Sequence, residues 1–381
     1  MTRSEREQGK TKKFHSYYDY TLLFVTLFLV CFGLVMIYST SSYNASRRYG
    51  DPTFFLQKQG ISAIIGAVVM VIVSKIDYHI YIKKLPIIKV KPVTLLFILC
   101  IFLQTYVLIF GKEINGAKRW IDLGPLGSFQ PSELSKIAVI LMTAYIVNLA
   151  PRRLDKFFGF IRVVLFVAPL IVLVLIPNFS TALVMSCMMI GICFVASRKK
   201  LYFIVSGIFA VGIGSAFVFG VSYRSTRVEV WRNVETHEKG YQILQGLYAI
   251  SSGGVFGRGL GESMQKLGFI PESHNDMIFS VICEELGLVG AISVIIIFVL
   301  LVWRLFIIAV NSPDLYGGLI ATGVLVHIAV QVLLNIAVVT NTIPSTGIPL
   351  PFISYGGTSL VVLLVEMGIV LSVSNQIKYE R

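Results

Sequence analysis

Long apolar runs recur along this chain and restrict the folds that are open to it. A helix needs about 20 mostly apolar residues to cross a hydrocarbon core of roughly 30 Å. Ten runs meet this requirement, at about residues 20–39, 57–74, 93–110, 132–149, 160–177, 179–197, 201–221, 277–302, 317–340 and 357–374. Each run is continuously apolar, whereas the strands of a membrane barrel alternate. The sequence therefore predicts an all-α, polytopic membrane protein with about ten transmembrane helices.

The composition supports the same fold class. Only 14% of the 381 residues are charged, and 55% are hydrophobic. Soluble domains carry roughly 25% charged residues, so a soluble enzyme and a disordered protein are both excluded. The net charge of +13 is explained by membrane topology, because basic residues accumulate in cytoplasmic loops. We therefore expect no nucleic acid among the partners.

The positions of Lys and Arg indicate the orientation. With a cytoplasmic N-terminus, 20 of the 33 basic residues fall in inside segments and 12 in outside loops. This bias predicts that both termini are cytoplasmic. Residues 1–19 then form a basic tail, residues 20–374 a single ten-helix membrane domain, and residues 375–381 a second tail. The longest connection, residues 222–276, becomes a large extracellular loop between the seventh and eighth helices, and loops of this length are usually functional.

Ionisable residues occur where the fourth span begins. Lys118 and Arg119 lie in the preceding outer loop, and Glu133 and Lys136 occupy positions i and i+3 on one helix face. Ionisable residues within a span usually face a bundle interior or a wet cavity. Two interpretations stay open. The pair either fixes helix packing as a structural ion pair, or forms the charged wall of an outward-facing cavity with Lys118 and Arg119 at its rim.

The long outer loop contains a glycine-rich string. Five of the nine residues in 253–261 are Gly, so a regular helix is not expected and the backbone can approach a ligand closely. Arg258 lies in this string, and Lys266 follows it. No βαβ context surrounds the string, which excludes a dinucleotide-binding motif. A re-entrant or surface loop near polar head groups fits better.

The same loop ends in a carboxylate, Asp276, directly before the eighth span. Asp276 can act as a helix N-cap or as a general base beside cations at the membrane–water boundary, and the two roles can coexist. Glu272 and His274 precede it as candidate substrate contacts. The five histidines show no spacing typical of a zinc site, so no metal ligands are assigned.

The last outer loop, residues 343–359, is rich in Pro and Gly and contains no charge. Ser354 is its candidate substrate contact. Physical reasoning alone allows this loop to be a gate, a lipid-contacting lip or a packing element.

These four strings, in order and across nearly the whole chain, resemble the SEDS (FtsW/RodA/SpoVE) family of bacterial membrane proteins, named for shape, elongation, division and sporulation. The motifs that carry the resemblance are residues 118–134, 256–266, 271–287 and 344–357. Two stretches depart from the family pattern. Residues 177–181 read Pro-Asn-Phe-Ser-Thr where the family usually reads Pro-Asp-Leu-Gly-Thr, so that Asn178 replaces an aspartate, and Asn275 replaces a threonine. Residues 311–317 and 338–348 look closer to the division and sporulation branch than to the elongation branch.

The resemblance implies a peptidoglycan glycosyltransferase that polymerises lipid II on the outer face of the bacterial cytoplasmic membrane. The essential aspartate of the family falls on Asp276, and the glutamate of its Pro-Ser-Glu-Leu motif falls on Glu133, with Lys136 as partner. The resemblance also implies a class B penicillin-binding protein (a transpeptidase) as partner. Further expected partners are undecaprenyl-pyrophosphate-linked glycan, membrane lipid, and other divisome or elongasome proteins.

The expected reaction begins when Asp276 takes the proton of the acceptor sugar's 4-hydroxyl, which attacks the donor's anomeric carbon with inversion. Lys118, Arg119, Arg258 and Lys266 are candidate cations for the leaving pyrophosphate, and Mg²⁺ is a candidate cofactor. The competing hypotheses are a lipid-linked oligosaccharide flippase and a non-catalytic scaffold for a transpeptidase. Intramembrane charges are equally expected in a transporter, but the polar groups here cluster on the outer side and the sequence shows no clear internal repeat.

Overall fold

A computed structural model describes residues 14–86, 89–114, 117–122, 124, 128–201, 203 and 222–380. In these residues nine helices are long and apolar enough to cross a membrane. They are α2 (Tyr20–Tyr49), α3 (Phe54–Lys75), α4 (Pro92–Phe110), α5 (Pro131–Leu149), α6 (Phe157–Leu175), α7 (Phe179–Ala196), α11 (Ile278–Asn311), α12 (Leu315–Val339) and α13 (Gly357–Asn375). The all-α polytopic prediction is confirmed. The seventh predicted span, 201–221, lies outside the described residues except at positions 201 and 203.

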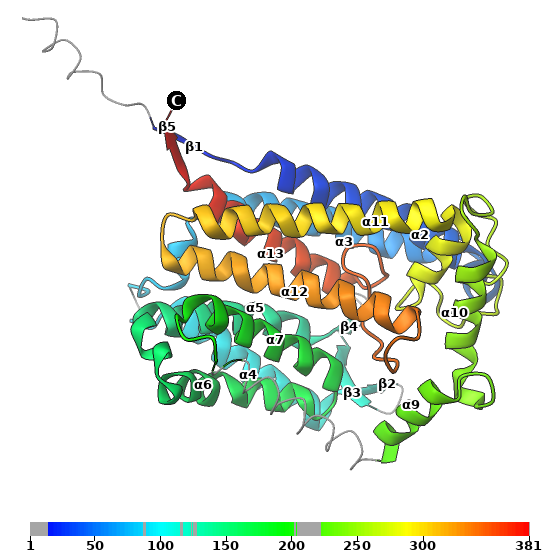
Figure 1. Ribbon diagram of the computed structural model, residues 1–381, viewed down its shortest axis with the longest axis horizontal. Coiled ribbons are helices and arrows are strands. Elements are labelled where there is room, and N and C mark those ends of the chain that lie inside the picture. The colour runs from blue at the N-terminus through cyan, green and yellow to red at the C-terminus, as the bar shows by residue number, and fades with distance from the viewer. Residues whose placement is uncertain are drawn as a thin grey trace, which may run out of the picture.

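The spanning helices lie side by side in one bundle (Figure 1). The short strands β1 (Phe14–Ser16) and β5 (Lys378–Glu380) pair in antiparallel fashion at one end of it. At the opposite end lie α9 (Ser222–Arg232) and α10 (Tyr241–Ser252), which belong to the long loop. The first and last described segments therefore meet on one side of the bundle, away from the long loop.

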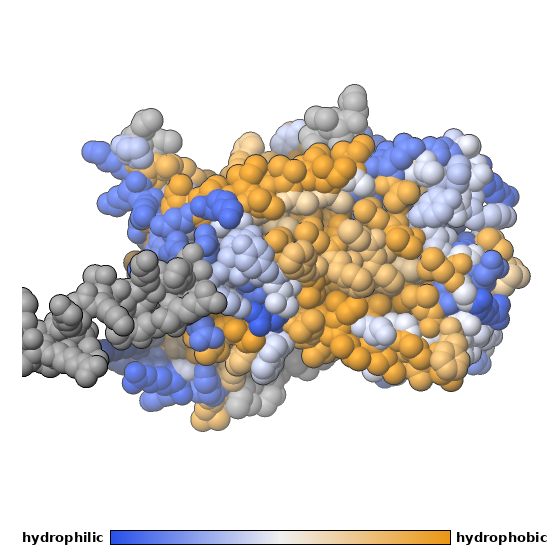
Figure 2. Space-filling view, turned by 90° about the horizontal axis from the view of Figure 1, so that it is seen from above, coloured by the Kyte–Doolittle hydropathy of each residue, from blue (hydrophilic) through white to orange (hydrophobic). Residues whose placement is uncertain are grey.

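The bundle surface has the pattern of a membrane protein. A broad hydrophobic band covers its middle, and hydrophilic residues gather toward both ends (Figure 2). Large apolar side chains of the outer helices form this band, including Ile64 of α3, Phe102 of α4 and Ile296 of α11, each at least 60% exposed. Lipid is the natural solvent for such a surface, because water would leave it unfavourably hydrated.

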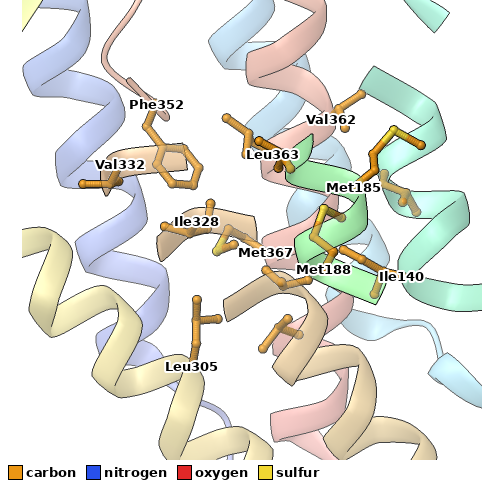
Figure 3. Close-up of a cluster of buried hydrophobic side chains, with 14 of the residues drawn as sticks. Ile140, Met185, Met188, Leu305, Ile328, Val332, Phe352, Val362, Leu363 and Met367 are labelled. Carbon is orange, nitrogen blue, oxygen red and sulfur yellow. The ribbon is translucent and has the colours of Figure 1, made fainter. Parts of the chain in front are cut away.

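The apolar core lies where α5, α7, α11, α12 and α13 meet (Figure 3). Ile140, Met188, Ile328 and Met367 are among its fully buried side chains. Methionine is unbranched and fills irregular gaps between helices that cross at different angles. Phe352, from the Pro/Gly-rich loop that precedes α13, also enters this cluster. The last outer loop is therefore anchored in the core, as expected of a packing element.

Shorter elements complete the two ends. A three-stranded sheet of order β2-β3-β4 connects α4 to α5 on the outer side, and two 3-10 helices serve the inner connections. The remaining bounds are β2 (Lys112–Ile114), β3 (Ala117–Asp122), β4 (Ser128–Phe129), η1 (Tyr78–Tyr81), η3 (Pro151–Asp155) and η4 (Glu238–Gly240). Helices α6 and α7 form a tight helical hairpin. In the turn between them, the Asn178 side chain caps α7 by accepting a hydrogen bond from the Thr181 N–H at 3.2 Å.

One helix extends well beyond its predicted end. The apolar run predicted an end near residue 39, but α2 continues to Tyr49, where Gly50 adopts a left-handed conformation with φ of +73°. The added turns are polar, and their hydroxyls bond back to helix carbonyls: Thr40 Oγ1 to Met36 O at 2.8 Å and Ser41 Oγ to Ile37 O at 2.6 Å. The polar residues are thus satisfied within the helix, so hydropathy alone placed its end too early.

Candidate active site at the outer end of the bundle

Asp276 lies in the turn that leads into α11 and is half-buried. It does not cap the helix with its side chain: Met277 occupies the N-cap position, with no side-chain capping bond. Gln242 of α10 donates to Asp276 Oδ1 at 3.5 Å. Gly347 of the Pro/Gly-rich loop also lies nearby: an added Cβ there would be 3.9 Å from Asp276 Oδ2, an ordinary van der Waals contact. The carboxylate therefore lies next to both α10 of the long loop and the Pro/Gly-rich loop.

The surroundings of Asp276 tune its acidity. Burial raises the pKa of this carboxyl from 3.8 to about 6, and the negative charge of Glu272 adds to the rise. The charge of Arg227 and the bond from Gln242 act in the opposite direction. A carboxyl with a pKa near 6 is ionised at neutral pH and still basic enough to accept a proton in a transition state. Asp276 therefore has the properties of a general base.

Arg227 is a residue of this site that the sequence analysis missed. Its Nη1 donates to the carbonyl of Ser345 at 2.9 Å, and Trp231, one turn later on α9, donates through Nε1 to the carbonyl of Asn341 at 2.9 Å. These bonds dock α9 against the Pro/Gly-rich loop, near Asp276. The spacing of Arg and Trp by four residues, on one helix face, was the available sequence signal.

His274 anchors the loop that carries Asp276. Its ring packs against Phe55 with centroids 4.3 Å apart and meets Tyr355 edge-on at 5.5 Å. Burial lowers the pKa of His274 to about 4, so the ring is neutral at physiological pH. The next residue back, Ser273, donates to the carbonyl of Thr40 at 3.0 Å. His274 therefore lies in an aromatic cluster with Phe55 and Tyr355.

Two other predicted substrate contacts, Glu272 and Ser354, differ in their exposure to solvent. Glu272 is exposed, adopts φ of +49° and accepts a bond from Asn275 Nδ2 at 2.8 Å. Ser354 is buried, and its hydroxyl accepts the main-chain N–H of Leu350 at 2.8 Å. Glu272 is thus open to a ligand, whereas Ser354 closes a turn of the Pro/Gly-rich loop.

The predicted pair on α5 forms as an ion pair. Lys136 Nζ lies 2.9 Å from Glu133 Oε2, with side-chain exposures of 4% and 9%. A second buried pair lies within the bundle, where His327 Nδ1 is 2.7 Å from Glu366 Oε2. Of the two interpretations left open for Glu133 and Lys136, the enclosure of both side chains favours the structural ion pair.

Lys118 and Arg119 lie on β3 at the outer rim. Lys118 is exposed and donates to the carbonyl of Ile109 at 3.1 Å. Arg119 Nε donates to the carbonyl of Pro177 at 2.7 Å, in the turn between α6 and α7. Ser180, in the first turn of α7, bonds in turn to the carbonyl of Thr346 at 2.8 Å. Arg119 is therefore linked, through one helix end, to the loop that lines Asp276.

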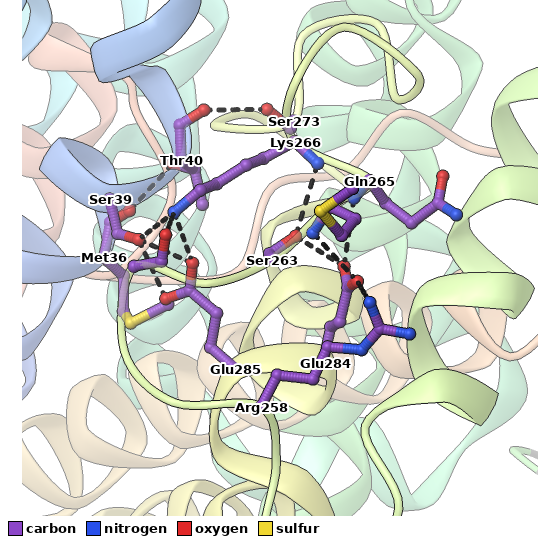
Figure 4. A network of polar contacts seen from close by, with 12 residues as sticks. Met36, Ser39, Thr40, Arg258, Ser263, Gln265, Lys266, Ser273, Glu284 and Glu285 are labelled. Carbon is purple, nitrogen blue, oxygen red and sulfur yellow. Dashed lines mark hydrogen bonds and ion pairs between the residues drawn. The ribbon is translucent and has the colours of Figure 1, made fainter.

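Arg258 and Lys266 belong to a polar network between the long loop and α11 (Figure 4). Lys266 Nζ lies 2.7 Å from Glu285 Oε1, and both side chains are nearly fully enclosed. Arg258 Nη1 lies 3.7 Å from Glu284 Oε1, but its side chain remains 42% exposed. Of these two predicted pyrophosphate contacts, only Arg258 presents its guanidinium to solvent.

The glycine-rich string approaches protein backbone. Helix α11 is broken at Gly287, which has φ of +67° and ψ of −166°. Four main-chain bonds of 2.9–3.1 Å bridge the break: residues 258 and 259 donate to the carbonyls of 284 and 285, and residues 288 and 289 donate to the carbonyls of 254 and 255. A Cβ at Gly257 would lie 2.2 Å from Glu285 O. The glycines thus let the loop satisfy the open backbone groups of an interrupted helix.

Comparisons with known proteins find similar sequences over nearly the whole chain. The family model described as "Cell cycle protein" (FtsW/RodA/SpoVE) matches residues 20–379. Stage V sporulation protein E of Bacillus subtilis is 37% identical over 95% of this chain and 98% of its own. The probable peptidoglycan glycosyltransferase FtsW of Geobacter sulfurreducens is 38% identical over 95% and 96%.

Solved structures with the same fold cover almost the whole chain. One belongs to a peptidoglycan synthase complex described as coordinating polymerization and crosslinking; it has a TM-score of 0.78 and 27% identity over 94% of this chain and 98% of its own. The rod shape determining protein RodA of Thermus thermophilus matches with a TM-score of 0.68 and 25% identity over 96% and 98%.

Proposed function

This chain belongs to the FtsW/RodA/SpoVE family of cell cycle proteins. We propose that it is a peptidoglycan glycosyltransferase, as the FtsW relatives are named, and that Asp276 is its general base. It is a multi-pass protein of the bacterial cytoplasmic membrane. The observation that carries the catalytic assignment is the half-buried Asp276 carboxyl at the outer end of the bundle, whose pKa is about 6.

The proposed reaction joins two lipid-linked substrates. Asp276 accepts the proton of the 4-hydroxyl of lipid II while the oxygen forms a bond to the anomeric carbon of the growing glycan. The bond between that carbon and the pyrophosphate oxygen breaks, and undecaprenyl pyrophosphate leaves with the electron pair. Attack from the opposite face inverts the anomeric centre. General-base assistance of this kind contributes about 10²–10⁴-fold to the rate.

The leaving pyrophosphate needs positive charge near the developing negative charge. Arg227 is near enough to act on the Asp276 carboxyl, and Lys118, Arg119 and Arg258 lie on the outer side with part of their surface exposed. We assign the pyrophosphate to these cations. Lys266 and Lys136 are neutralised by Glu285 and Glu133, and we leave them out of the binding set.

Mg²⁺ stays a proposal. In the described part of the chain, no three His, Cys, Asp or Glu side chains gather in a way that would hold a metal ion. The described residues therefore supply no cluster of protein ligands for a metal ion, and the proposed reaction does not require one. Mg²⁺ is bound in many enzymes through substrate phosphates and water, so we propose that a divalent cation arrives with the pyrophosphate.

The named relatives point to a biological setting and a partner. The relatives at 37–38% identity are sporulation and division proteins, which favours the division and sporulation branch. One structural relative belongs to a synthase complex in which polymerization and crosslinking are coordinated. We therefore propose a class B penicillin-binding protein as the crosslinking partner, with other divisome or elongasome proteins assembled around the pair.

Glycan-strand formation by the purified protein tests this function. The protein is incubated with lipid II, with and without a class B transpeptidase, and products are separated by length. We expect polymer from the wild type and from Glu262→Gln, which removes an exposed carboxylate of the same loop, and none from a folded Asp276→Asn variant. Polymer from Asp276→Asn would remove the base assignment. Lipid II translocation in vesicles without any polymer would instead support the flippase.

A further inference from the structure

One face of α12 carries three polar side chains at intervals of four residues. His327, Gln331 and Asn335 are at most 2% exposed, and residues spaced by four lie one above the other on a helix. Gln331 Nε2 donates to the carbonyl of Pro349 at 3.0 Å. Asn335 lies one turn closer to the outer end, at the level of the proposed active site.

The amide group of Asn335 connects two separate segments. Its Nδ2 donates to the carbonyl of Asp276 at 2.8 Å and to the carbonyl of Ile348 at 2.8 Å. A primary amide nitrogen has two hydrogens, so both are used and the separation of the two carbonyls is fixed by one rigid planar group. The first carbonyl belongs to Asp276, the proposed general base. The second belongs to Ile348, which directly follows Gly347, the glycine beside the Asp276 carboxylate.

We infer that Asn335 is a positioning residue for Asp276: its amide holds the main chain of the base and the main chain of the Pro/Gly-rich loop at the separation that places Gly347 beside the carboxylate. This inference rests on the proposed function, because positioning matters only if Asp276 acts on substrate. Asn335 itself is buried and does not touch the reacting atoms.

Positioning by Asn335 should also affect the pKa of Asp276. The charged groups that act on the Asp276 carboxyl are Glu272 in its own turn and Arg227 on α9, with the Gln242 amide on α10. Burial is the largest cause of its raised pKa. If the carbonyl bonds are lost and the carboxyl swings toward water, this pKa falls toward the ordinary value of 3.8, and the carboxyl is then a weaker and misplaced base.

Gln331 is a matched control on the same helix face. Like Asn335, it is buried and donates from an amide to a carbonyl of the Pro/Gly-rich loop. Unlike Asn335, it makes no recorded bond to Asp276. A purely structural role for these amides therefore predicts similar effects at both positions, whereas positioning of the base predicts an effect on chemistry only at Asn335.

The test compares Asn335→Leu, which keeps the approximate size without donors, with Gln331→Leu. Each full-length protein is assayed for polymerisation of lipid II from pH 5 to 9, with thermal unfolding as a measure of folding. For Asn335→Leu we expect kcat to fall by about 100-fold, the loss typical of a misplacement of about 1 Å, with KM changed less than about threefold. The acid limb of its pH profile should shift to lower pH. Gln331→Leu should keep kcat within about threefold and leave the acid limb near pH 6.

A second variant keeps the test decisive if Asn335→Leu does not fold. Asn335→Ser retains one donor and can keep one of the two carbonyl bonds, so we expect a smaller loss of kcat with the same direction of pH shift. Equal losses at positions 335 and 331 with an unchanged acid limb would reduce Asn335 to a structural residue.

The Asp276→Asn variant, run in the same assay, separates the two levels of the proposal. If it polymerises lipid II, the proposed function fails and the positioning inference fails with it. If it is inactive while Asn335→Leu or Asn335→Ser behaves as wild type, only the positioning inference fails.

Discussion

Lys266 and Glu285 lie 2.7 Å apart in a site that is closed to solvent. Ser39 of α2 donates to the same carboxylate at 2.7 Å, and the carbonyl of Gly261 accepts from the same ammonium group at 2.6 Å. The pair therefore joins α2, the long outer loop and α11 at one point (Figure 4). Because its charge is already compensated by Glu285, we expect Lys266 to stabilise the outer end of the bundle.

Replacement of Lys266 by Met should destabilise the protein strongly. The change leaves the Glu285 carboxylate buried without its counter-charge, which typically costs about 3–5 kcal/mol. The double variant Lys266→Met/Glu285→Met removes both charges and should recover most of that loss. Thermal unfolding in detergent measures both effects. A stable Lys266→Met protein whose only defect is a higher KM for lipid II would show instead that Lys266 contacts substrate.

Replacement of Asp276 by Asn should abolish activity and stabilise the fold. The pKa of Asp276 is raised from 3.8 to about 6, so between these values the folded state holds a proton that the unfolded state has released. Stability is therefore lost as pH rises through this window, by at most about 3 kcal/mol. Asn escapes that cost, so Asp276→Asn should unfold at a higher temperature than wild type at pH 7.5 but not at pH 3.5. If Asp276→Asn and the wild type unfold at the same temperature as each other at pH 7.5 as well as at pH 3.5, the raised pKa of Asp276 is contradicted.

Removal of the Arg227 charge should shift the pH profile of the enzyme. Arg227 lowers the pKa of Asp276, so Arg227→Gln should raise that pKa above 6 and move the acid limb of kcat/KM to higher pH. Arg232→Gln, which removes an exposed cation from the same helix, is the control and should leave the limb in place. An identical limb in both variants would mean that Arg227 does not act on the base.

Three glycines of the outer region should respond differently to alanine. Gly257 and Gly287 have φ of +76° and +67°, and an added Cβ would lie 2.2 and 2.3 Å from backbone atoms. Gly254 has φ of +56° with open space around it. We expect Gly254→Ala to cost about 1–2 kcal/mol of backbone strain, and Gly257→Ala and Gly287→Ala to cost at least twice as much or to prevent folding. Expression level and thermal unfolding rank the variants, and equal stability of all three would contradict the backbone clash.

Hydropathy predicted the membrane fold well because each span must bury apolar side chains in lipid over a fixed thickness. It failed at the end of α2, where hydroxyls bonded to their own helix extend it to Tyr49. It could not show the break at Gly287, because a loop about 30 residues earlier in the chain repairs the helix. Local pattern gives no sign of such a distant main-chain partner.

The residues of the candidate site also differ in whether the signal for them lies in their own segment or in distant parts of the chain. Asp276 could be proposed from the sequence because a carboxylate at the membrane boundary is anomalous within its own segment. Arg227 and Asn335 were missed because their partners, carbonyls in the last outer loop and at Asp276 itself, lie up to 118 residues away in the sequence. The ion pair of Lys266 with Glu285 could not be predicted, because a cation's counter-charge cannot be read from neighbouring residues when it comes from another element.

The main-chain bonds between the glycine-rich string and α11 lie on both sides of the break at Gly287. The two segments therefore depend on each other: a substitution that displaces the backbone of the string also leaves peptide groups of α11 without hydrogen-bond partners.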